Sequence, residues 1–162
     1  MILILGRFQP FHNGHLKVLK DAYAEDKNVV VAIGSACMSH EPENPFITDE
    51  RIKMLKAVFK EEKMDIKTYK VPNIPCDSHY VEHVAKHVGG MPKKVITENP
   101  WTVELFEKKG IEVVVTERYF GISATEIRKK MMRGDEWKKD VPAVVVKIIE
   151  KIGGVERIKS LN

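Results

Sequence analysis

MILILGRFQPFHNGH, residues 1–15, contains the strongest structural signal in the chain. Its first five residues are continuously apolar, which is typical of a strand covered on both faces of a parallel sheet. Gly6 then allows the backbone to approach a ligand closely, and Pro10 ends the strand. These residues therefore predict a buried strand, a tight loop and the start of a helix.

Further apolar runs follow this first strand, and helical patterns separate them. We expect five strands, at residues 1–5, 28–33, 65–71, 93–97 and 112–115. Between them, amphipathic patterns predict helices at residues 13–25, 48–61, 78–88 and 100–109. Such alternation is typical of βαβ units with right-handed crossovers. The predicted fold class is α/β, a Rossmann-like, doubly wound, five-stranded parallel sheet with a helical C-terminal extension.

After the last strand the pattern changes to helices alone. These are expected at about residues 123–133, 142–152 and 154–160. The sequence has no linker, repeat or low-complexity segment. We therefore expect a single domain over residues 1–162, with an α/β core at 1–121 and a helical part at 122–162.

Composition places the chain among ordinary soluble globular proteins. It is 43% hydrophobic and 31% charged. Residues 1–6 lack a basic leader, and no apolar run approaches the ~20 residues that span a bilayer, so we expect a cytoplasmic protein without a membrane partner. The net charge of +4 is spread along the chain, which does not point to nucleic acid. Cys37 and Cys76 form no CxxC pair and are expected to be incidental reduced thiols.

The loop after the first strand has side chains suited to a phosphate. His12 and His15 lie at a helix N-terminus, where free N–H groups and the helix dipole favour an anion. Arg7 adds a positive charge, and Gly14 leaves room beside the imidazoles. A strand-to-helix turn with two solvated histidines is an equally good interpretation of so short a motif. Its place after the first strand of a parallel sheet favours the phosphate site.

A second candidate anion site opens a late helix at residues 121–128. Ser123 and Glu126 have the spacing of a capping box, which explains both residues structurally. Thr125 and Arg128 are not explained by capping. A helix N-terminus with hydroxyls and an arginine one turn later is suited to bind phosphate. Two such sites predict a ligand with several phosphates.

Together the two motifs carry a family resemblance. The HxGH motif (His12, Gly14, His15) and the ISxTxxR motif (Ile122, Ser123, Thr125, Arg128) resemble those of the nucleotidyltransferase superfamily. Other stretches are similar to the archaeal type of nicotinamide-nucleotide adenylyltransferase, namely residues 34–40, 43–46, 50–51, 98–100 and 154–157. The resemblance covers essentially the whole chain.

This resemblance implies transfer of AMP from ATP to nicotinamide mononucleotide, giving NAD and pyrophosphate by direct in-line attack. We expect Mg²⁺ to arrive with the ATP phosphates, because the sequence contains no dedicated carboxylate cage. No other metal site and no nucleic-acid partner are expected. The assembly of relatives into rings implies a homo-oligomer. Nicotinic acid mononucleotide, phosphopantetheine and FMN are alternative acceptors. A nucleotide-binding sensor without turnover and an RNA-binding module are the alternatives from other functional classes.

The site residues follow from the same resemblance. The catalytic residues are expected to be His12, His15 and Arg128. The ATP-binding residues are expected to be Gly6, Arg7, Phe8, His12, Gly14, His15, Asn99, Ser123, Thr125 and Arg128. The acceptor-binding residues are expected to be Ser39, His40, Asn44, Arg51, Asn73 and Tyr80.

Arg51 has two interpretations from the sequence. Thr48 is expected to cap the helix at 48–61, which places Arg51 one turn in and suits it to an acceptor phosphate. In so acidic a stretch a surface ion pair is the ordinary interpretation of an arginine. The family resemblance favours the phosphate ligand.

The chain departs from the family pattern where the nicotinamide ring is expected. Asn73 stands where the family has an aspartate, and Tyr80 where it has a tryptophan. Tyrosine stacks on a pyridinium less strongly than tryptophan does. The loop at residues 117–120 is also shorter than in relatives. These departures leave the choice between the amide and the acid acceptor open.

His79, His83 and His87 recur every fourth residue and therefore share one face of the predicted helix. HxxxH spacing is compatible with zinc, but no acidic or cysteine ligand completes a set in this stretch. A solvated stripe is the preferred interpretation.

Overall fold

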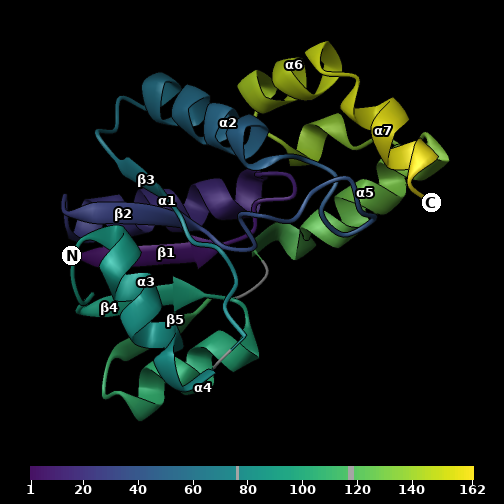
Figure 1. Ribbon diagram of the computed structural model, residues 1–162. Helices are drawn as coiled ribbons and strands as arrows, with labels where there is room; N and C mark the ends of the chain where they lie inside the picture. The colour runs from purple at the N-terminus through teal and green to yellow at the C-terminus, as the bar shows by residue number, and fades with distance from the viewer. Residues whose placement is uncertain (76, 117–118) are drawn as a thin grey trace. The chain divides into compact units, whose positions relative to one another are not determined.

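The computed structural model (Figure 1) describes residues 1–75, 77–116 and 119–162. These residues form two compact units. Unit 1 consists of Met1–Gly6, Val18–Ala36 and Ile66–Glu117. Unit 2 consists of Arg7–Lys17, Cys37–Asp65 and Arg118–Asn162. Cys76, Glu117 and Arg118 lie outside the described residues, so the expectations for the Cys76 thiol and for the loop at 117–120 stay predictions.

Unit 1 contains the whole sheet. Its strands are all parallel and lie in the order β3-β2-β1-β4-β5, with bounds β1 (Ile2–Gly6), β2 (Val29–Ile33), β3 (Lys67–Lys70), β4 (Lys94–Thr97) and β5 (Glu112–Val115). Along the chain, the strands proceed outward from β1 through β2 to β3, and β4 then pairs with the other side of β1. This confirms the predicted doubly wound sheet. In such sheets ligands bind at the carboxyl ends of the strands, where the order reverses.

Both faces of the central strands are buried because their residues are apolar without interruption. One face, which includes Leu3 and Val30, packs against helices α3 (Tyr80–Val88) and α4 (Pro100–Lys108) in a common core (Figure 1). Side chains on the opposite face, among them Ile4, are buried too. Alternation of side chains along a strand places neighbours on opposite faces, so a continuous apolar run serves both.

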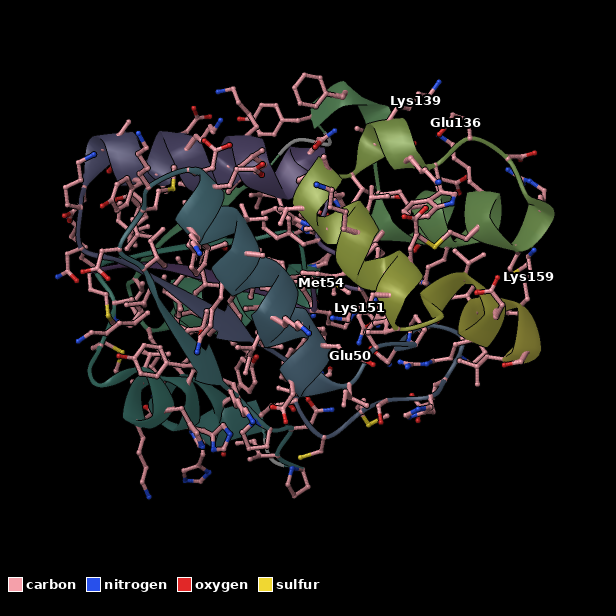
Figure 2. The ribbon with its side chains drawn as sticks, turned by 90° about the horizontal axis from the view of Figure 1, so that it is seen from above. Glu50, Met54, Glu136, Lys139, Lys151 and Lys159 are labelled. Atoms are coloured by element: carbon pink, nitrogen blue, oxygen red, sulfur yellow. The ribbon has the colours of Figure 1, made fainter. Side chains whose placement is uncertain are left out.

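Helices α2 (Thr48–Glu61), α5 (Ala124–Arg133), α6 (Ala143–Lys151) and α7 (Gly154–Ser160) belong to unit 2. Figure 2 shows α2, with Glu50 and Met54, beside α6, with Lys151. A Cβ atom at Gly154 would lie 2.8 Å from Phe46 and 2.9 Å from Ile149, so α7 begins at a position that requires glycine. Helix α1 (Asn13–Glu25) begins in unit 2 and continues into unit 1.

The predicted elements exist, and their ends match the structure to within two residues. The strand expected at 65–71 is limited to Lys67–Lys70, because β3 is an edge strand whose pairing with β2 covers only those residues. The helix expected at 78–88 begins at Tyr80, after a 3₁₀ turn at Asp77–His79. The single domain divided at residue 121 stays a prediction. Within the described part of the chain, no helix has the length and apolar character needed to cross a membrane.

Candidate functional site

His12 and His15 hold each other in a fixed arrangement at the start of α1. Their rings are stacked, with centroids 3.6 Å apart and planes 21° from parallel. The backbone N–H of His12 donates to Nδ1 of His15 (3.2 Å), and the backbone N–H of His15 donates to Nδ1 of His12 (3.3 Å). An Nδ1 that accepts carries no proton. The geometry therefore assigns both rings to the neutral form with hydrogen on Nε2.

Burial keeps both imidazoles neutral. It lowers the pKa of His12 from 6.5 to about 4, against a smaller opposing effect of the Asp140 carboxylate. Burial, and then repulsion from His12, lower the pKa of His15 well below its ordinary value. At neutral pH the pair therefore presents two Nε2–H donors, which suit phosphate oxygens.

The pKa of His12 makes the stability of the fold depend on pH. The unfolded chain protonates this side chain near pH 6.5, whereas the folded chain does so only near 4. The unfolded state thus binds more protons below pH 6.5. The free energy of unfolding should fall between pH 6.5 and 4, by at most about 3 kcal/mol from this group. Denaturant unfolding of wild type and His12→Gln at pH 7.5 and 4.5 measures it. We expect a smaller loss in His12→Gln, and equal losses would refute the assignment.

Residues around the pair leave the rings little freedom. A Cβ atom at Gly14 would lie 3.0 Å from two ring atoms of His12, so the glycine is needed for the ring to occupy this position. Phe8 and Phe11 contact the other ring, with centroids 5.0 Å and 5.4 Å from that of His15. Phe8 has φ 54°, a left-handed conformation that bulky residues seldom adopt. The loop backbone is thus shaped around the histidines.

Arg51 is fully buried, with 0% of its surface exposed. Its guanidinium donates to the backbone oxygen of Arg7 (3.1 Å) and to the hydroxyl of Thr48 (2.8 Å). Thr48 was expected to cap α2, and this is wrong: Ile47 occupies the N-cap position, and its N–H donates to the Glu50 carboxylate (3.0 Å). Burial, and then the charge of Arg7, lower the pKa of Arg51 to about 10.

Arg128 reaches the same loop from α5. Its side chain is buried and donates to the backbone oxygen of Gln9 (2.8 Å) and to the hydroxyl of Thr125 (3.4 Å). Burial, and then the charge of Arg7, lower the pKa of Arg128. Ser123 caps α5 by accepting the N–H of Glu126 (3.2 Å), as the capping motif predicted. The N-terminal part of α5 therefore carries Arg128 and the hydroxyls of Ser123 and Thr125.

Arg7 completes a cationic site. Its side chain is half exposed, and its contact with the exposed Glu43 is long (3.4 Å), a kind of surface pair that stabilises little. We call Arg7, His12, His15, Arg51 and Arg128 the anion cradle. Arg7 disfavours the charge of both buried arginines. A negative ligand reverses this effect, so the cradle is suited to an anion with several charges.

Gln9 is a positioning residue that the sequence analysis did not identify. Its side chain is 1% exposed, donates to the backbone oxygen of Phe46 (2.9 Å) and accepts the N–H of Phe46 (3.0 Å). These two bonds join the loop after β1 to the segment before α2. The partners are 37 residues apart in sequence, so no local pattern could have found the pair.

Arg157 and Asp140 are two further residues that interact with the surroundings of the anion cradle. Arg157 forms a two-pronged ion pair with Glu50 (2.6 and 2.9 Å) and donates to the backbone oxygen of Pro45 (3.1 Å). Asp140 is buried, pairs with Lys130 and raises the pKa of His12. Arg157 lies in a stretch that the family resemblance had marked. Asp140 had no sequence signal.

The expected acceptor residues on the loop after β2 lie in unit 2. His40 has φ 56° and an Nδ1 atom 3.2 Å from the Ser39 hydroxyl. Asn44 is buried and donates to the Glu41 carboxylate (3.2 Å). Among the described residues, no hydrogen bond reaches the buried Oδ1 atom of Asn44. That atom is available to a ligand donor.

The remaining expected site residues lie in unit 1. Gly6 ends β1, and its oxygen accepts the N–H of Gly34 (2.9 Å). Asn99 caps α4 by accepting the N–H of Trp101 (3.1 Å). Asn73 is exposed, whereas only 8% of Tyr80 is exposed. The binding roles expected for these four residues stay predictions.

The histidine stripe of α3 is built into local hydrogen bonds. Nε2 of His83 lies 2.9 Å from the oxygen of Pro72, and Nδ1 of His87 lies 2.8 Å from the oxygen of His83. His79 bonds to the Ser78 hydroxyl (3.0 Å). Within residues 1–75, 77–116 and 119–162, no group of three or more His, Cys, Asp or Glu side chains is placed to hold a metal ion. Cys37 is exposed and free.

Comparison with known proteins gives a consistent set of relatives. A family model described as cytidylyltransferase-like matches residues 3–130. The chain is 41% identical to the nicotinamide-nucleotide adenylyltransferase of Methanolobus tindarius, over 98% of this chain and 92% of that protein. It is 40% identical to the protein of the same name from Thermococcus kodakarensis, over 98% of this chain and 87% of that protein.

Among solved structures, the fold is similar to a bifunctional NMN adenylyltransferase/ADP ribose pyrophosphatase from Francisella tularensis, complexed with AMP and a manganese ion. The TM-score is 0.75 and the identity 20%, over 98% of this chain and 52% of that chain. This chain thus spans about half the length of that neighbour. At this identity the likeness shows the fold alone.

Proposed function

The chain belongs to the cytidylyltransferase-like family, and we propose that it transfers AMP from ATP to nicotinamide mononucleotide, giving NAD and pyrophosphate. One observation carries the proposal: two buried arginines and two neutral histidines of the anion cradle are arranged around residues 7–15. The activity named for relatives at about 40% identity supports the same reaction.

Each residue of the anion cradle is assigned to one of the two substrates by the chemistry of its side chain. His12 and His15 donate to the α-phosphate of ATP, since their Nε2–H groups are fixed by the Nδ1 bonds. Arg7 and Arg128, with Ser123 and Thr125, hold the β- and γ-phosphates. Further ATP contacts are proposed for Gly6, Phe8, Gly14 and Asn99. The acceptor is proposed to contact Arg51, Ser39, His40, Asn44, Asn73 and Tyr80.

The reaction is a direct in-line displacement. An oxygen of the acceptor phosphate attacks the α-phosphorus of ATP, the bond to the bridging oxygen breaks, and pyrophosphate leaves with the bonding electrons. Negative charge grows on the α-phosphate oxygens in the transition state, where hydrogen bonds from His12 and His15 become stronger. The rate then depends on positioning and on electrostatic stabilisation, which the buried donors supply without reorganisation.

Mg²⁺ is proposed to enter on the ATP phosphates. The side chains of the cradle are cationic or neutral donors, which suit phosphate oxygens and do not suit a bare cation. Mg²⁺ typically keeps several waters and is held partly through substrate phosphates. When bound, it neutralises charge on the departing pyrophosphate.

The proposal also covers the location, the assembly and the partners of the protein. The protein acts in the cytoplasm as a homo-oligomer of one nucleotidyltransferase domain per chain, without a nucleic-acid partner. Several apolar side chains are exposed that an oligomer could cover, among them Val115 (58%) and Phe120 (72%). Light scattering tests the assembly.

Pyrophosphate release from ATP and Mg²⁺ tests the function, with four acceptors compared in parallel: nicotinamide mononucleotide, nicotinic acid mononucleotide, phosphopantetheine and FMN. We expect release with nicotinamide mononucleotide, coupled to NAD formation. Preference for another acceptor would reassign the substrate. Tight ATP binding without release with any of the four would contradict the enzyme.

Arg51 should govern the acceptor more than ATP. In Arg51→Lys the charge stays, but a lysine cannot reproduce the paired donors of the guanidinium toward a phosphate and the Arg7 oxygen. We expect kcat/KM for nicotinamide mononucleotide to fall by about thirtyfold, about 2 kcal/mol, with a smaller change for ATP. Lys53→Ala, an exposed change on the same helix, is the matched control. An equal fall for both substrates would contradict the assignment to the acceptor.

A further inference from the structure

The segment at residues 44–47, which leads into α2, is held by a side chain of the last helix. Arg157 of α7 donates to the backbone oxygen of Pro45 (3.1 Å). The same guanidinium donates twice to the carboxylate of Glu50, in the first turn of α2 (2.6 and 2.9 Å; Figure 2). We call these three hydrogen bonds the α7 clasp. All of its residues belong to unit 2.

The clasp is sheltered from solvent and its geometry is specific. Only 20% of the Arg157 side chain and 15% of the Glu50 side chain are exposed. A two-pronged arginine–carboxylate pair fixes the orientation of both groups, and a sheltered pair is screened less than a surface pair. Glu50 also accepts the N–H of Ile47 (3.0 Å), so its carboxylate joins Arg157 to the N-cap of α2. Residues 45 and 47 are thus both tied to the clasp.

The other side of the segment is bonded to the loop that carries the histidines. Phe46 exchanges two hydrogen bonds with the side chain of Gln9 (2.9 and 3.0 Å). The backbone oxygen of Gln9 accepts from the guanidinium of Arg128 (2.8 Å). A continuous set of hydrogen bonds therefore runs from Arg157 through the segment and Gln9 to Arg128.

Arg51 is connected to the segment more directly. Its backbone N–H donates to the oxygen of Ile47 (3.1 Å), and its guanidinium donates to the hydroxyl of Thr48 (2.8 Å). Both partners lie at the start of α2, where Glu50 and the clasp fix the backbone. A shift of the segment therefore displaces Arg51 through a single helical turn.

Resting on the proposed function, we propose that Arg157 is a positioning residue for substrate binding, which fixes residues 44–47 and through them the two buried arginines of the anion cradle. The donors of its guanidinium are directed at Pro45 and Glu50, so its effect on a substrate passes through Arg51 and Arg128. Arg51 is reached through α2 alone, whereas Arg128 is reached through Gln9. The acceptor, which is assigned to Arg51, should depend on the clasp more than the pyrophosphate group does.

Steady-state kinetics of Arg157→Ala test the positioning role. We expect KM for nicotinamide mononucleotide to rise about tenfold, because binding must then order a segment that the clasp holds in advance. The value of kcat should change less than about twofold, since His12 and His15 are fixed by their own mutual bonds. Such a separation of KM from kcat marks a loosened binding site.

A merely structural role predicts the opposite result. An enzyme that is partly unfolded loses apparent kcat, but its folded molecules keep the KM of the wild type. Ile158→Val is the matched control, because Ile158 is the buried neighbour of Arg157 on α7. It should lower the melting temperature and leave KM unchanged. Lys159→Ala, an exposed change on the same helix, should alter neither.

Two further variants keep the test decisive if Arg157→Ala does not fold. Arg157→Lys retains the charge for Glu50 but lacks the fork that also reaches the Pro45 oxygen, so KM should rise about threefold. Glu50→Gln retains an oxygen for the Ile47 N–H and removes the charge of the pair. If Arg157 acts through Glu50, combining Glu50→Gln with Arg157→Lys should raise KM by less than the product of the two single effects.

Calorimetric binding of pyrophosphate gives a readout that does not need turnover. Inorganic pyrophosphate carries several negative charges and is the group assigned to Arg128 and Arg7. We expect the wild type to bind it and Arg157→Ala to bind it about threefold more weakly, because the effect passes through Gln9. Circular dichroism verifies that each variant is folded.

The outcomes separate this inference from the proposed function. NAD formation by the wild type, with KM unchanged in folded Arg157→Ala and Arg157→Lys, overturns the clasp alone. Weaker pyrophosphate binding in folded Arg157→Ala, without NAD formation by the wild type, supports the clasp and overturns the enzyme. Neither NAD formation nor pyrophosphate binding overturns both. Fully multiplicative effects of the Glu50 and Arg157 changes overturn the pair as the means of positioning.

Discussion

His15→Ala should lose about a hundredfold in kcat, about 3 kcal/mol of transition-state stabilisation, and keep its fold. The Nε2–H of His15 is a neutral donor on a partly buried ring that the bond at Nδ1 fixes in place. Its hydrogen bond grows stronger as charge develops on the α-phosphate, so its removal lowers kcat more than it raises KM for ATP.

Two amide variants identify the atom responsible. Asn at position 15 can replace the Nδ1 acceptor of the His12 N–H but has no donor at the position of Nε2. Gln can place an N–H₂ near that position. We expect His15→Asn to be as slow as His15→Ala, and His15→Gln to recover part of the rate. His87→Ala, a change on α3, is the control. A folded, fully active His15→Ala would sink the assignment.

Arg128→Lys should lower kcat/KM for ATP by about a hundredfold. The guanidinium donates at once to the Gln9 oxygen and the Thr125 hydroxyl from a buried position. A lysine has one charged nitrogen and cannot reproduce this fork while it also contacts a phosphate. Because one donor group replaces two, the hydrogen bond to the loop at Gln9 weakens. The electrostatic stabilisation of the negative charge on the leaving pyrophosphate weakens as well.

Arg128→Ala separates stability from catalysis. The buried oxygen of Gln9 then loses a donor, which should lower the free energy of unfolding by about 1–3 kcal/mol. Arg128→Lys should lose less stability than Arg128→Ala and nearly as much activity. Lys129→Ala, an exposed neighbour paired with Glu126, should change neither. ATP kinetics unaffected in a stable Arg128→Ala would contradict the proposed role.

The sheet could be predicted from the sequence, and the two candidate phosphate motifs could be located there, because both depend on local patterns. Uninterrupted apolar runs specify strands buried on both faces, and β1 and β2 are such strands. The HxGH spacing identified both histidines. Their mutual Nδ1 bonds and their neutral form could not be predicted, because they depend on the backbone of a loop in which Phe8 adopts a left-handed conformation.

Arg51 shows which structural features could not be predicted from the sequence. A surface ion pair was the ordinary interpretation of Arg51, yet it is fully buried and bonds to a backbone oxygen 44 residues away. The Thr48 prediction failed because its hydroxyl accepts from Arg51, and the cap position moves to Ile47. Burial and a backbone partner 44 residues away determine the position of Arg51, and neither has a local signature in the sequence.

The packing of Tyr80 shows the same limit. Its ring centroid lies 4.5 Å from that of Trp101 on the neighbouring helix and the ring is buried, whereas Trp101 is exposed. This difference has no signature in residue spacing, because the two residues are 21 positions apart and helix packing brings them together.

The central claim is that AMP passes directly from ATP to nicotinamide mononucleotide, and labelled ATP tests it most directly. The wild-type protein is incubated with Mg²⁺, the acceptor and ATP labelled in the α-phosphate, and pyrophosphate is measured in the same samples. We predict that the label appears in NAD in a one-to-one ratio with pyrophosphate, with none on the protein. Label on the protein, or release as ADP or free AMP without NAD, would contradict the account.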